Sequence, residues 1–330
     1  MRAIFNALTV MLALVAGCDI PSVATPATPT SAARPCDGAK VVDVSSAEQL
    51  TQALAAAAPG AVIRLAAGTY RGAFVAKASG TADAPITLCG PRTAVLDGGP
   101  ISGGYTLHLD GAAHWQVSGF TVQNGQKGVM LDAAAGNLVE GLLVEGTGDE
   151  AVHLRKGSTD NIVRDNVIRD TGKRQGKFGE GIYVGTAESN WCEISACDPD
   201  RSDRNTIEDN AVSDTTAESV DIKEGTTGGV LRDNSFSGTG MTDATAWVNV
   251  KGNDWTIADN TGVDAPEDGF QVHQILDGWG LDNVFTGNVS TVNAGGYAVN
   301  ITKNADRNRV SCTNTAKGAG KGLSSIECTR

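Results

Sequence analysis

A short strand motif recurs along most of this 330-residue chain. Each copy is a five-residue segment with apolar residues at its second and fourth positions. The copies lie at 106–110, 128–132, 151–155, 181–185, 219–223, 247–251, 269–273 and 298–302. Such alternation over a short run is typical of a half-buried β-strand. Because one such strand buries only one face, the copies must stack on each other to enclose a core.

An asparagine recurs in step with these strands. It occupies Asn166, Asn210, Asn234, Asn260, Asn288 and Asn314. The steps lie in the twenties, apart from one of 44 that includes an insertion at 186–204. A period in the twenties indicates a solenoid, and the leucine framework of leucine-rich repeats is missing. We therefore predict an all-β, single-stranded right-handed parallel β-helix whose turn asparagines are structural and tolerate left-handed backbone.

Three segments are predicted before and within this solenoid. Residues 1–17 combine Arg2 with a short apolar run and end on small residues before Cys18, so they resemble a bacterial lipoprotein signal. That resemblance implies lipidation of Cys18; an ordinary signal peptide is the alternative. Residues 18–35 are rich in Pro, Ala and Thr and are predicted to form a tether. Residues 36–330 are predicted to form the β-helix domain. A helix over 46–58, capped by Ser46, is predicted to cover the N-terminal end of the solenoid.

The signal segment predicts that the protein lies in the cell envelope. It would be a periplasmic or cell-surface lipoprotein that contacts a membrane only through its lipid. Export favours disulfides. The remaining six cysteines allow fifteen pairings, and we predict the sequential one: Cys36 with Cys89, Cys192 with Cys197, and Cys312 with Cys328. We expect a monomer.

The net charge of −12 excludes a general nucleic-acid binder, because phosphate neutralisation requires clustered Lys and Arg. It does not exclude an anionic substrate, provided that cations gather locally. Equivalent positions of stacked strands form columns about 4.8 Å apart per rung. One outward column carries Arg155, Lys223, Lys251 and His273; another carries His153, Tyr183, Asp221, Asn249 and Gln271; Glu150, Glu180 and Glu218 lie just before the strands.

Two interpretations of this face stay open. It is either a polysaccharide-binding groove or a solvated sheet face with ion pairs between rungs. The insertion at 186–204 contains Trp191, Cys192 and Cys197. A long loop that is tied by a disulfide beside a polar groove favours a wall or lid that carries a sugar-stacking aromatic residue.

The first repeats are similar to the opening of pectate-lyase-like β-helix enzymes. The residues that carry this likeness are 61–65, 68–70, 85–88 and 95–98. The stretch 218–223, with the sequence ESVDIK, resembles the catalytic stretch of the chondroitinase B and alginate lyase family. The resemblance implies that Lys223 is a general base and Glu218 a carboxylate beside calcium. Two positions depart from the family pattern: Glu224 follows the lysine, and the cation one rung on is Lys251.

These residues suit β-elimination from a uronate-containing, acidic polysaccharide. The proton α to the carboxylate is weakly acidic, so the carboxylate must be neutralised by a cation or metal. Lys223, Lys251, Arg155 and His273 are the candidate catalytic residues, and a lysine among other cations is expected to have a lowered pKa. His153, Tyr183, Trp191, Asn249 and Gln271 are candidate substrate-binding residues. Glu150, Glu180, Glu218 and Asp221 are the candidate ligands of Ca²⁺.

Two other functions remain open. A glycoside hydrolase on the same fold would use carboxyl groups such as Asp149, Glu150 and Asp221, and an epimerase on this fold is a further alternative. A non-catalytic, glycan-binding surface lipoprotein would use the same groove without chemistry. A lyase creates an unsaturated product, a hydrolase creates reducing ends alone, and a binder creates neither.

Overall fold

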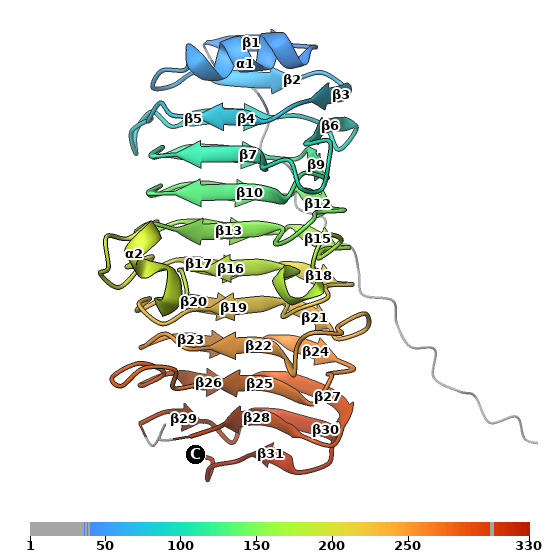
Figure 1. Ribbon diagram of the computed structural model, residues 1–330, viewed down its shortest axis with the longest axis vertical. Coiled ribbons are helices and arrows are strands. Elements are labelled where there is room, and N and C mark those ends of the chain that lie inside the picture. The colour runs from blue at the N-terminus through green and yellow to red at the C-terminus, as the bar shows by residue number, and fades with distance from the viewer. Residues whose placement is uncertain (1–35, 37, 39, 304–306) are drawn as a thin grey trace, which may run out of the picture. The chain divides into compact units, whose positions relative to one another are not determined.

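The computed structural model describes residues 36, 38, 40–303 and 307–330, which belong to the compact unit Ser31–Arg330. Within this part the chain winds through three parallel sheets, here called A, B and C in the order in which each turn visits them. Figure 1 shows the turns stacked one on another, with helix α1 (Ala47–Ala55) at one end. The predicted right-handed parallel β-helix is confirmed.

The strands of each sheet pair with those of the preceding and following turns. Sheet A contains β1 (Val41–Val44), β2 (Val62–Leu65), β5 (Ile86–Cys89), β8 (Trp115–Ser118), β11 (Leu138–Glu140), β14 (Ile162–Arg164), β17 (Thr206–Glu208), β20 (Val230–Arg232), β23 (Thr256–Ala258), β26 (Val284–Thr286) and β29 (Arg309–Val310). Sheet B contains β3 (Gly68–Arg71), β6 (Ala94–Asp97), β9 (Thr121–Gln123), β12 (Leu143–Glu145), β15 (Val167–Arg169), β18 (Ala211–Ser213), β21 (Ser235–Ser237), β24 (Thr261–Val263), β27 (Val289–Ala294) and β30 (Thr315–Ala319).

Sheet C carries the predicted groove. It contains β4 (Phe74–Ala76), β7 (Tyr105–Asp110), β10 (Lys127–Asp132), β13 (Val152–Arg155), β16 (Ile182–Val184), β19 (Val220–Ile222), β22 (Ala246–Val250), β25 (Asp268–Val272), β28 (Tyr297–Ile301) and β31 (Gly322–Ser324). Three short helices lie in the loops around it: η1 (Gly176–Phe178), η2 (Glu188–Asn190) and α2 (Trp191–Ile194).

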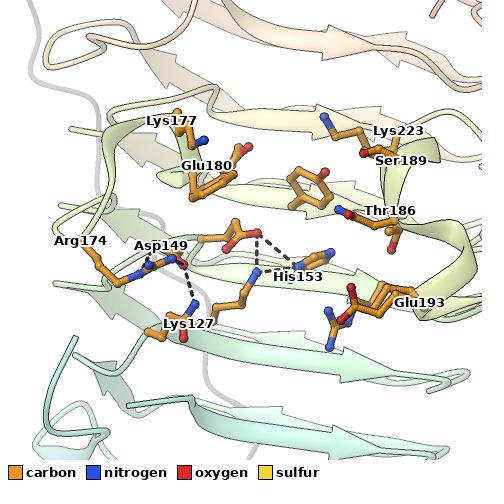
Figure 2. Close-up of a pocket in the computed structure, with 18 residues that line it drawn as sticks. Lys127, Asp149, His153, Arg174, Lys177, Glu180, Thr186, Ser189, Glu193 and Lys223 are labelled. Atoms are coloured by element: carbon orange, nitrogen blue, oxygen red, sulfur yellow. Dashed lines mark hydrogen bonds and ion pairs between the residues drawn. The ribbon is translucent and has the colours of Figure 1, made fainter. Parts of the chain in front are cut away.

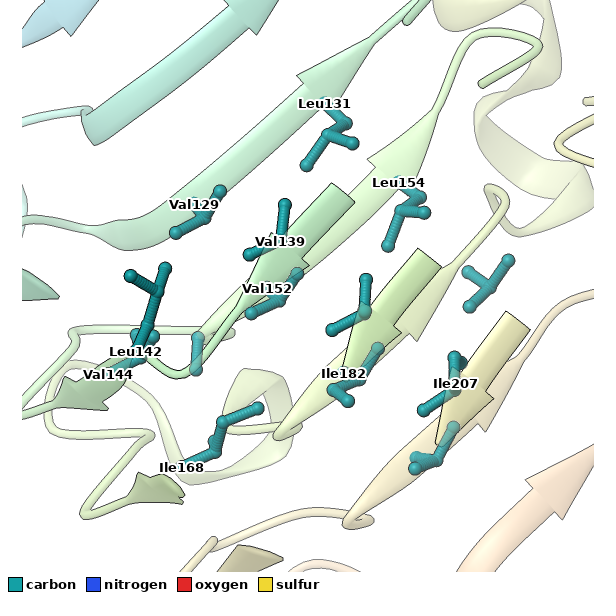
Figure 3. Close-up of a cluster of buried hydrophobic side chains, with 14 of the residues drawn as sticks. Val129, Leu131, Val139, Leu142, Val144, Val152, Leu154, Ile168, Ile182 and Ile207 are labelled. Atoms are coloured by element: carbon teal, nitrogen blue, oxygen red, sulfur yellow. The ribbon is translucent and has the colours of Figure 1, made fainter. Parts of the chain in front are cut away.

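The core lies inside the coil and consists of the alternating apolar residues. Val129 and Leu131 of β10 pair in register with Val152 and Leu154 of β13, and all four side chains are fully buried. Figure 3 shows how such residues from neighbouring turns stack in rows between the sheets. Because identical positions stack, each turn extends one continuous core instead of forming its own.

The recurring asparagines form a hydrogen-bonded ladder beside this core. The Asn166 side-chain amide donates to Asn210 Oδ1 at 2.9 Å, and Asn210 donates to Asn234 Oδ1 at 3.0 Å. The same bond continues through Asn260, Asn288 and Asn314. The structural role is therefore confirmed, but the left-handed residue of these turns is the one before the asparagine, as at Asp165 and Asp209.

Helix α1 covers the N-terminal end of the coil. Ser46 Oγ accepts from the Gln49 N–H at 3.2 Å, while Leu50 and Leu54 are fully buried against the first turn. The helix ends at Ala55, before the predicted residue 58, because Pro59 disfavours helical backbone just ahead of it. The amphipathic helix thus closes an otherwise exposed core.

The three predicted disulfides are present: Cys36–Cys89, Cys192–Cys197 and Cys312–Cys328. Over the residues that the structure describes, none of the helices has the length and apolarity needed to cross a bilayer. The predicted signal, Cys18 and the tether lie outside the described residues.

Candidate functional site

The outward column predicted on sheet C is confirmed by the strand register. His153 pairs with Tyr183, Tyr183 with Asp221, Asp221 with Asn249, and Asn249 with Gln271. These residues come from five consecutive turns, so the parallel stacking alone brings them into one row.

The second column continues the same hydrogen-bond ladder beyond the strand ends. The backbone N–H groups of Lys223, Lys251 and His273 each donate to the carbonyl of the last residue of the preceding sheet C strand. These acceptors are Val184, Ile222 and Val250. Their side chains therefore rise from the same edge of sheet C on successive turns. The predicted stripe of cations is thus a geometric feature of the fold.

Asp221 lies between two of these cations. Lys223 Nζ is 2.7 Å from its carboxylate, and Lys251 Nζ contacts both oxygens at 2.7 and 2.9 Å. Burial alone would raise the pKa of Asp221, but the two ammonium charges hold it at about 2. Asp221 is therefore ionised at all ordinary pH values.

The same contact decides the ionisation of Lys223. Burial acts to lower the pKa of Lys223, but the charge of Asp221 and its hydrogen bond to the ammonium outweigh burial and raise that pKa. The expectation of a lowered lysine pKa is wrong, because an anion lies between the lysines. Lys223 is a cation in this structure, and its ammonium lies 4.9 Å from the centre of the Tyr183 ring.

Tyr183 occupies the centre of the groove floor. Burial and the nearby carboxylates raise its pKa well above the usual value, although Lys223 opposes them. The phenol therefore keeps its proton across the neutral range. His153 packs edge-on against the ring, with 4.5 Å between centroids.

His153 is held from both sides. Its Nε2 donates to the Gly185 carbonyl at 3.0 Å, so Nδ1 is the acceptor that faces Lys127 Nζ at 3.3 Å. Burial and the Lys127 charge lower its pKa. With only 4% of its surface exposed, His153 supports the Tyr183 ring and is not a free binding group.

Glu150 and Arg155 are likewise committed to partners. Lys127 Nζ lies 2.6 Å from Glu150. Burial would raise the pKa of this carboxyl, but the neighbouring His153 and the Lys127 charge lower it to about 2. Arg155 donates to Asp132 at 2.7 Å and to the Tyr105 hydroxyl at 3.0 Å. Glu150 therefore does not join the other predicted metal ligands.

The other three predicted ligands do converge. Glu180, Glu218 and Asp221 each offer an oxygen within 4.8 Å of the others. Burial and mutual repulsion raise the pKa of Glu218 and raise that of Glu180 well above its usual value. Over the described residues, Glu180 Oε2 and Asn249 Oδ1 are buried and have no hydrogen-bond partner. An all-oxygen donor set with excess negative charge fits a hard cation such as Ca²⁺.

A cavity of about 450 Å³ opens above this floor. Its floor carries Glu150, His153, Glu180, Tyr183 and Lys223, and its volume lies in the range of small-molecule sites. Figure 2 shows two walls: the loop 171–179 on one side, and the start of the insertion on the other. The walls come from loops, whereas the floor comes from sheet C.

The insertion forms a fixed wall. Asp200 is fully buried and accepts from the backbone N–H groups of Lys156 and Gly157 and from the Thr186 and Ser202 hydroxyls, at 2.7–3.0 Å. Glu224, the residue that departs from the lyase pattern, accepts from the Glu188 N–H at 2.7 Å. These buried bonds anchor both ends of the wall.

Trp191 is not a groove residue. Only 8% of its surface is exposed, and its indole N–H donates to the Thr186 carbonyl at 2.8 Å. The predicted stacking role is therefore wrong, because the tryptophan forms the small core of the insertion itself.

Glu218 and Asp221 do not line this cavity, and four further predicted residues lie on the same sheet face outside it: Asn249, Lys251, Gln271 and His273. The His273 imidazole is 2.8 Å from Gln271 Oε1, and burial together with the Lys251 charge lowers its pKa. These residues extend the floor by two turns beyond Asp221.

The cavity residues that the sequence reasoning missed include Lys127, Arg174, Lys177 and Phe178. Lys127 immediately precedes its repeat, as Glu150 and Glu180 precede theirs, so the column could have revealed it. The other three lie in an elongated connection: 30 residues separate Ala151 from Gly181, against 23 for the previous step. The extra length of this connection was the sequence signal for a loop beside the groove.

Comparisons with known proteins agree with this geometry. A family model described as "Right handed beta helix region" matches residues 93–200. An alginate lyase structure from Paenibacillus sp. str. FPU-7 is 36% identical with a TM-score of 0.81, covering 88% of this chain and 99% of that one. The pectate lyase Pel9A (16% identity, TM-score 0.53, covering 83% and 75%) and a rhamnogalacturonan lyase (14%, 0.58, covering 77% and 71%) share the fold. No curated protein sequence matches the chain.

Proposed function

This chain belongs to the right-handed β-helix family that includes the Paenibacillus alginate lyase, and from that premise we propose that it is a polysaccharide lyase. Its substrate is a uronate-containing polysaccharide, with alginate as the first candidate, and the reaction is β-elimination. The observation that carries the proposal is the Tyr183–Lys223 pair on the floor of a cavity that is lined by five lysine and arginine side chains.

The two groups of this pair suit the two proton transfers. Neutral Lys223 removes the proton at C5 of the uronate, and the electron pair forms the C4=C5 bond as the bond from C4 to the glycosidic oxygen breaks. Tyr183, whose raised pKa keeps it protonated, donates its proton to the leaving oxygen. The cations along the floor stabilise the charge that develops on the carboxylate.

The neutral form of Lys223 is scarce at neutral pH, because Asp221 raises its pKa. This favours a reaction that accelerates as the pH rises.

Glu180, Glu218 and Asp221, with Asn249 Oδ1, are the residues that would hold Ca²⁺. A cation there would supply further positive charge opposite the uronate carboxylate. The fit rests on the buried, unpartnered oxygens of Glu180 and Asn249 among the described residues. Calorimetric titration of the protein with Ca²⁺ is expected to show binding that Glu180→Gln weakens.

The decisive experiment follows the near-ultraviolet absorbance of the unsaturated product. Protein from residue 36 onward is incubated with alginate, pectate, chondroitin, hyaluronan and heparin-type glycans, each with Ca²⁺ or a chelator. We expect absorbance to rise with a uronate polymer and Lys223→Ala to reduce the rate by at least about 100-fold. Lys77→Ala is the matched control, since Lys77 is largely exposed and follows directly after β4, far along sheet C.

A flat trace without new reducing ends, on every polymer, would reject the lyase and favour a glycan-binding lipoprotein. New reducing ends without absorbance would favour a hydrolase. One observation supports that second candidate: Glu180 has a raised pKa and the nearby Asp221 a lowered one, as a general acid and its partner require.

We also propose that the protein is exported and held in the cell envelope through a lipid on Cys18, as a monomer. The support is the sequence of residues 1–18. Metabolic labelling with a fatty acid is expected to mark the full-length protein, and Cys18→Ser is expected to abolish the label.

A further inference from the structure

The loop 171–179 presents an aromatic side chain and a lysine to the cavity. Phe178 is 37% exposed, and Lys177 Nζ lies 4.5 Å from the centre of its ring. Both residues line the cavity that contains Tyr183 and Lys223. Among the large hydrophobic side chains that are exposed over the described residues, Phe178 is the aromatic one, and it lies at the rim of this polar cavity.

Lys177 differs from the other cavity cations. Lys127 pairs with Glu150, Arg155 with Asp132, Arg174 with Asp149, and Lys223 with Asp221. Among the residues that the structure describes, Lys177 is the cavity cation that has no carboxylate partner. Its ammonium is therefore available to the carboxylate of a ligand.

The loop is held in place without help from a ligand. The Thr171 hydroxyl donates to the Gly179 carbonyl at 2.6 Å, which closes the loop, and the Thr216 hydroxyl donates to the Gly176 carbonyl at 2.7 Å. A Cβ at Gly172 or Gly179 would lie within 2 Å of Thr216 Oγ1, so both close approaches require glycine. Phe178 and Lys177 are thus displayed by a preformed wall.

We infer that Lys177 and Phe178 form a uronate-binding subsite next to the reacting sugar. A second uronate of the chain places a face of its ring against Phe178 and its carboxylate against Lys177. This inference rests on the proposed function, because it uses the same cavity and substrate class. Binding energy from such a neighbouring sugar positions the reacting one.

The test compares Phe178→Ala and Lys177→Gln with Lys173→Ala, a lysine of the same loop that pairs with Asp170 and lies outside the cavity. Binding of alginate oligosaccharides of defined length is measured by calorimetry on a Lys223→Ala background, and KM and kcat on the active protein. We expect each variant to weaken binding of longer oligosaccharides about tenfold, equal to about 1.4 kcal/mol. Oligosaccharides too short to reach the subsite, and the Lys173→Ala control, are expected to show no change.

The binding arm keeps this inference separate from the lyase proposal. If the protein cleaves no polymer, yet both variants lose oligosaccharide binding, the proposed subsite stands and the lyase proposal is rejected. An active lyase whose two variants bind and turn over long oligosaccharides like the wild type would overturn the subsite. A wild-type protein that binds no uronate oligosaccharide would overturn it as well.

Discussion

At the scale of single residues, Asp221 controls the proton chemistry of the floor. It lies 2.7 Å from the ammonium groups of Lys223 and Lys251, and its charge stabilises the charged form of Lys223. A lysine that is stabilised as a cation is a poor base until the pH is high. The chemistry proposed for Lys223 therefore carries a specific pH signature.

Asp221→Asn is predicted to shift that signature. Wild-type kcat/KM is expected to rise with pH, because only neutral Lys223 accepts the proton. Removing the anion lowers the pKa of Lys223, so the rising limb moves toward lower pH in the variant. Profiles of log kcat/KM against pH on the preferred polymer measure this shift; a limb that moved to higher pH, or activity that fell as the pH rose, would contradict Lys223 as the base.

Glu180 predicts a pH-dependent stability. Because burial and neighbouring carboxylates raise its pKa in the folded state, the folded protein keeps a proton that the unfolded chain releases above about pH 4.5. Stability is then lost as the pH rises through the folded-state pKa. Glu180→Gln is expected to unfold at a higher temperature than the wild type, by a margin that grows with pH and shrinks when Ca²⁺ is added to the wild type. Thermal unfolding scans over a pH series test this, with the exposed Glu188→Gln as control.

At the scale of elements, the groove combines parts with different origins. Sheet C supplies a floor whose spacing is set by strand stacking, while the two walls are loops anchored by single buried groups. Asp200 accepts two hydrogen bonds from the turn after β13, at Lys156 and Gly157, and two more from hydroxyls of the insertion itself. The shape of the cavity depends on such anchors and not on the walls' own secondary structure.

Asp200→Ala is predicted to release this wall. Buried donors that lose their acceptor cost roughly 1–3 kcal/mol each, so local opening becomes far easier. We expect faster tryptic cleavage at Arg201 and Arg204 and a KM several-fold higher, with a smaller change in kcat. Asp198→Ala, which alters an exposed residue of the same insertion, serves as the control. Unchanged proteolysis would show that the disulfide alone holds the insertion.

At the scale of the whole molecule, the solenoid is a sum of stacked turns joined by continuous rows. The asparagine ladder is the polar counterpart of the apolar core, since each amide bonds to the next turn. Leu50 and Leu54 of α1 complete the core at the end where there is no earlier turn. Stability thus depends on the contacts between neighbouring turns.

Interrupting the ladder is predicted to cost more than one hydrogen bond. Asn210→Ala removes the Oδ1 that accepts from the Asn166 backbone N–H and side-chain amide, and the amide that donates to Asn234 Oδ1 and the Val163 carbonyl. At roughly 1–3 kcal/mol for a buried unsatisfied group, the free energy of unfolding should fall by several kcal/mol. Urea denaturation measures it, and Asn190→Ala, at an exposed position, should leave it unchanged. An equal, small effect of both substitutions would mean that the ladder adds no stability.

The amino-acid sequence by itself determined the solenoid, its capping helix and the order of the outward columns. The physical reason is that period-two burial assigns each side chain a face, and stacking of equivalent turns then aligns positions such as His153, Tyr183 and Asp221. These features follow from local patterns that repeat.

The tertiary structure alone decided which charges touch and what the loops do. The sign of the Lys223 pKa shift depends on the placement of Asp221 between two lysines. The sequence gives the order of the residues along the column, but not the distances between their charged groups. Burial of Trp191 and exposure of Phe178 likewise depend on how two irregular loops fold onto the coil. Loop conformation follows from single anchors such as Asp200 and Thr216, whose partners lie on other turns, and no periodicity encodes them.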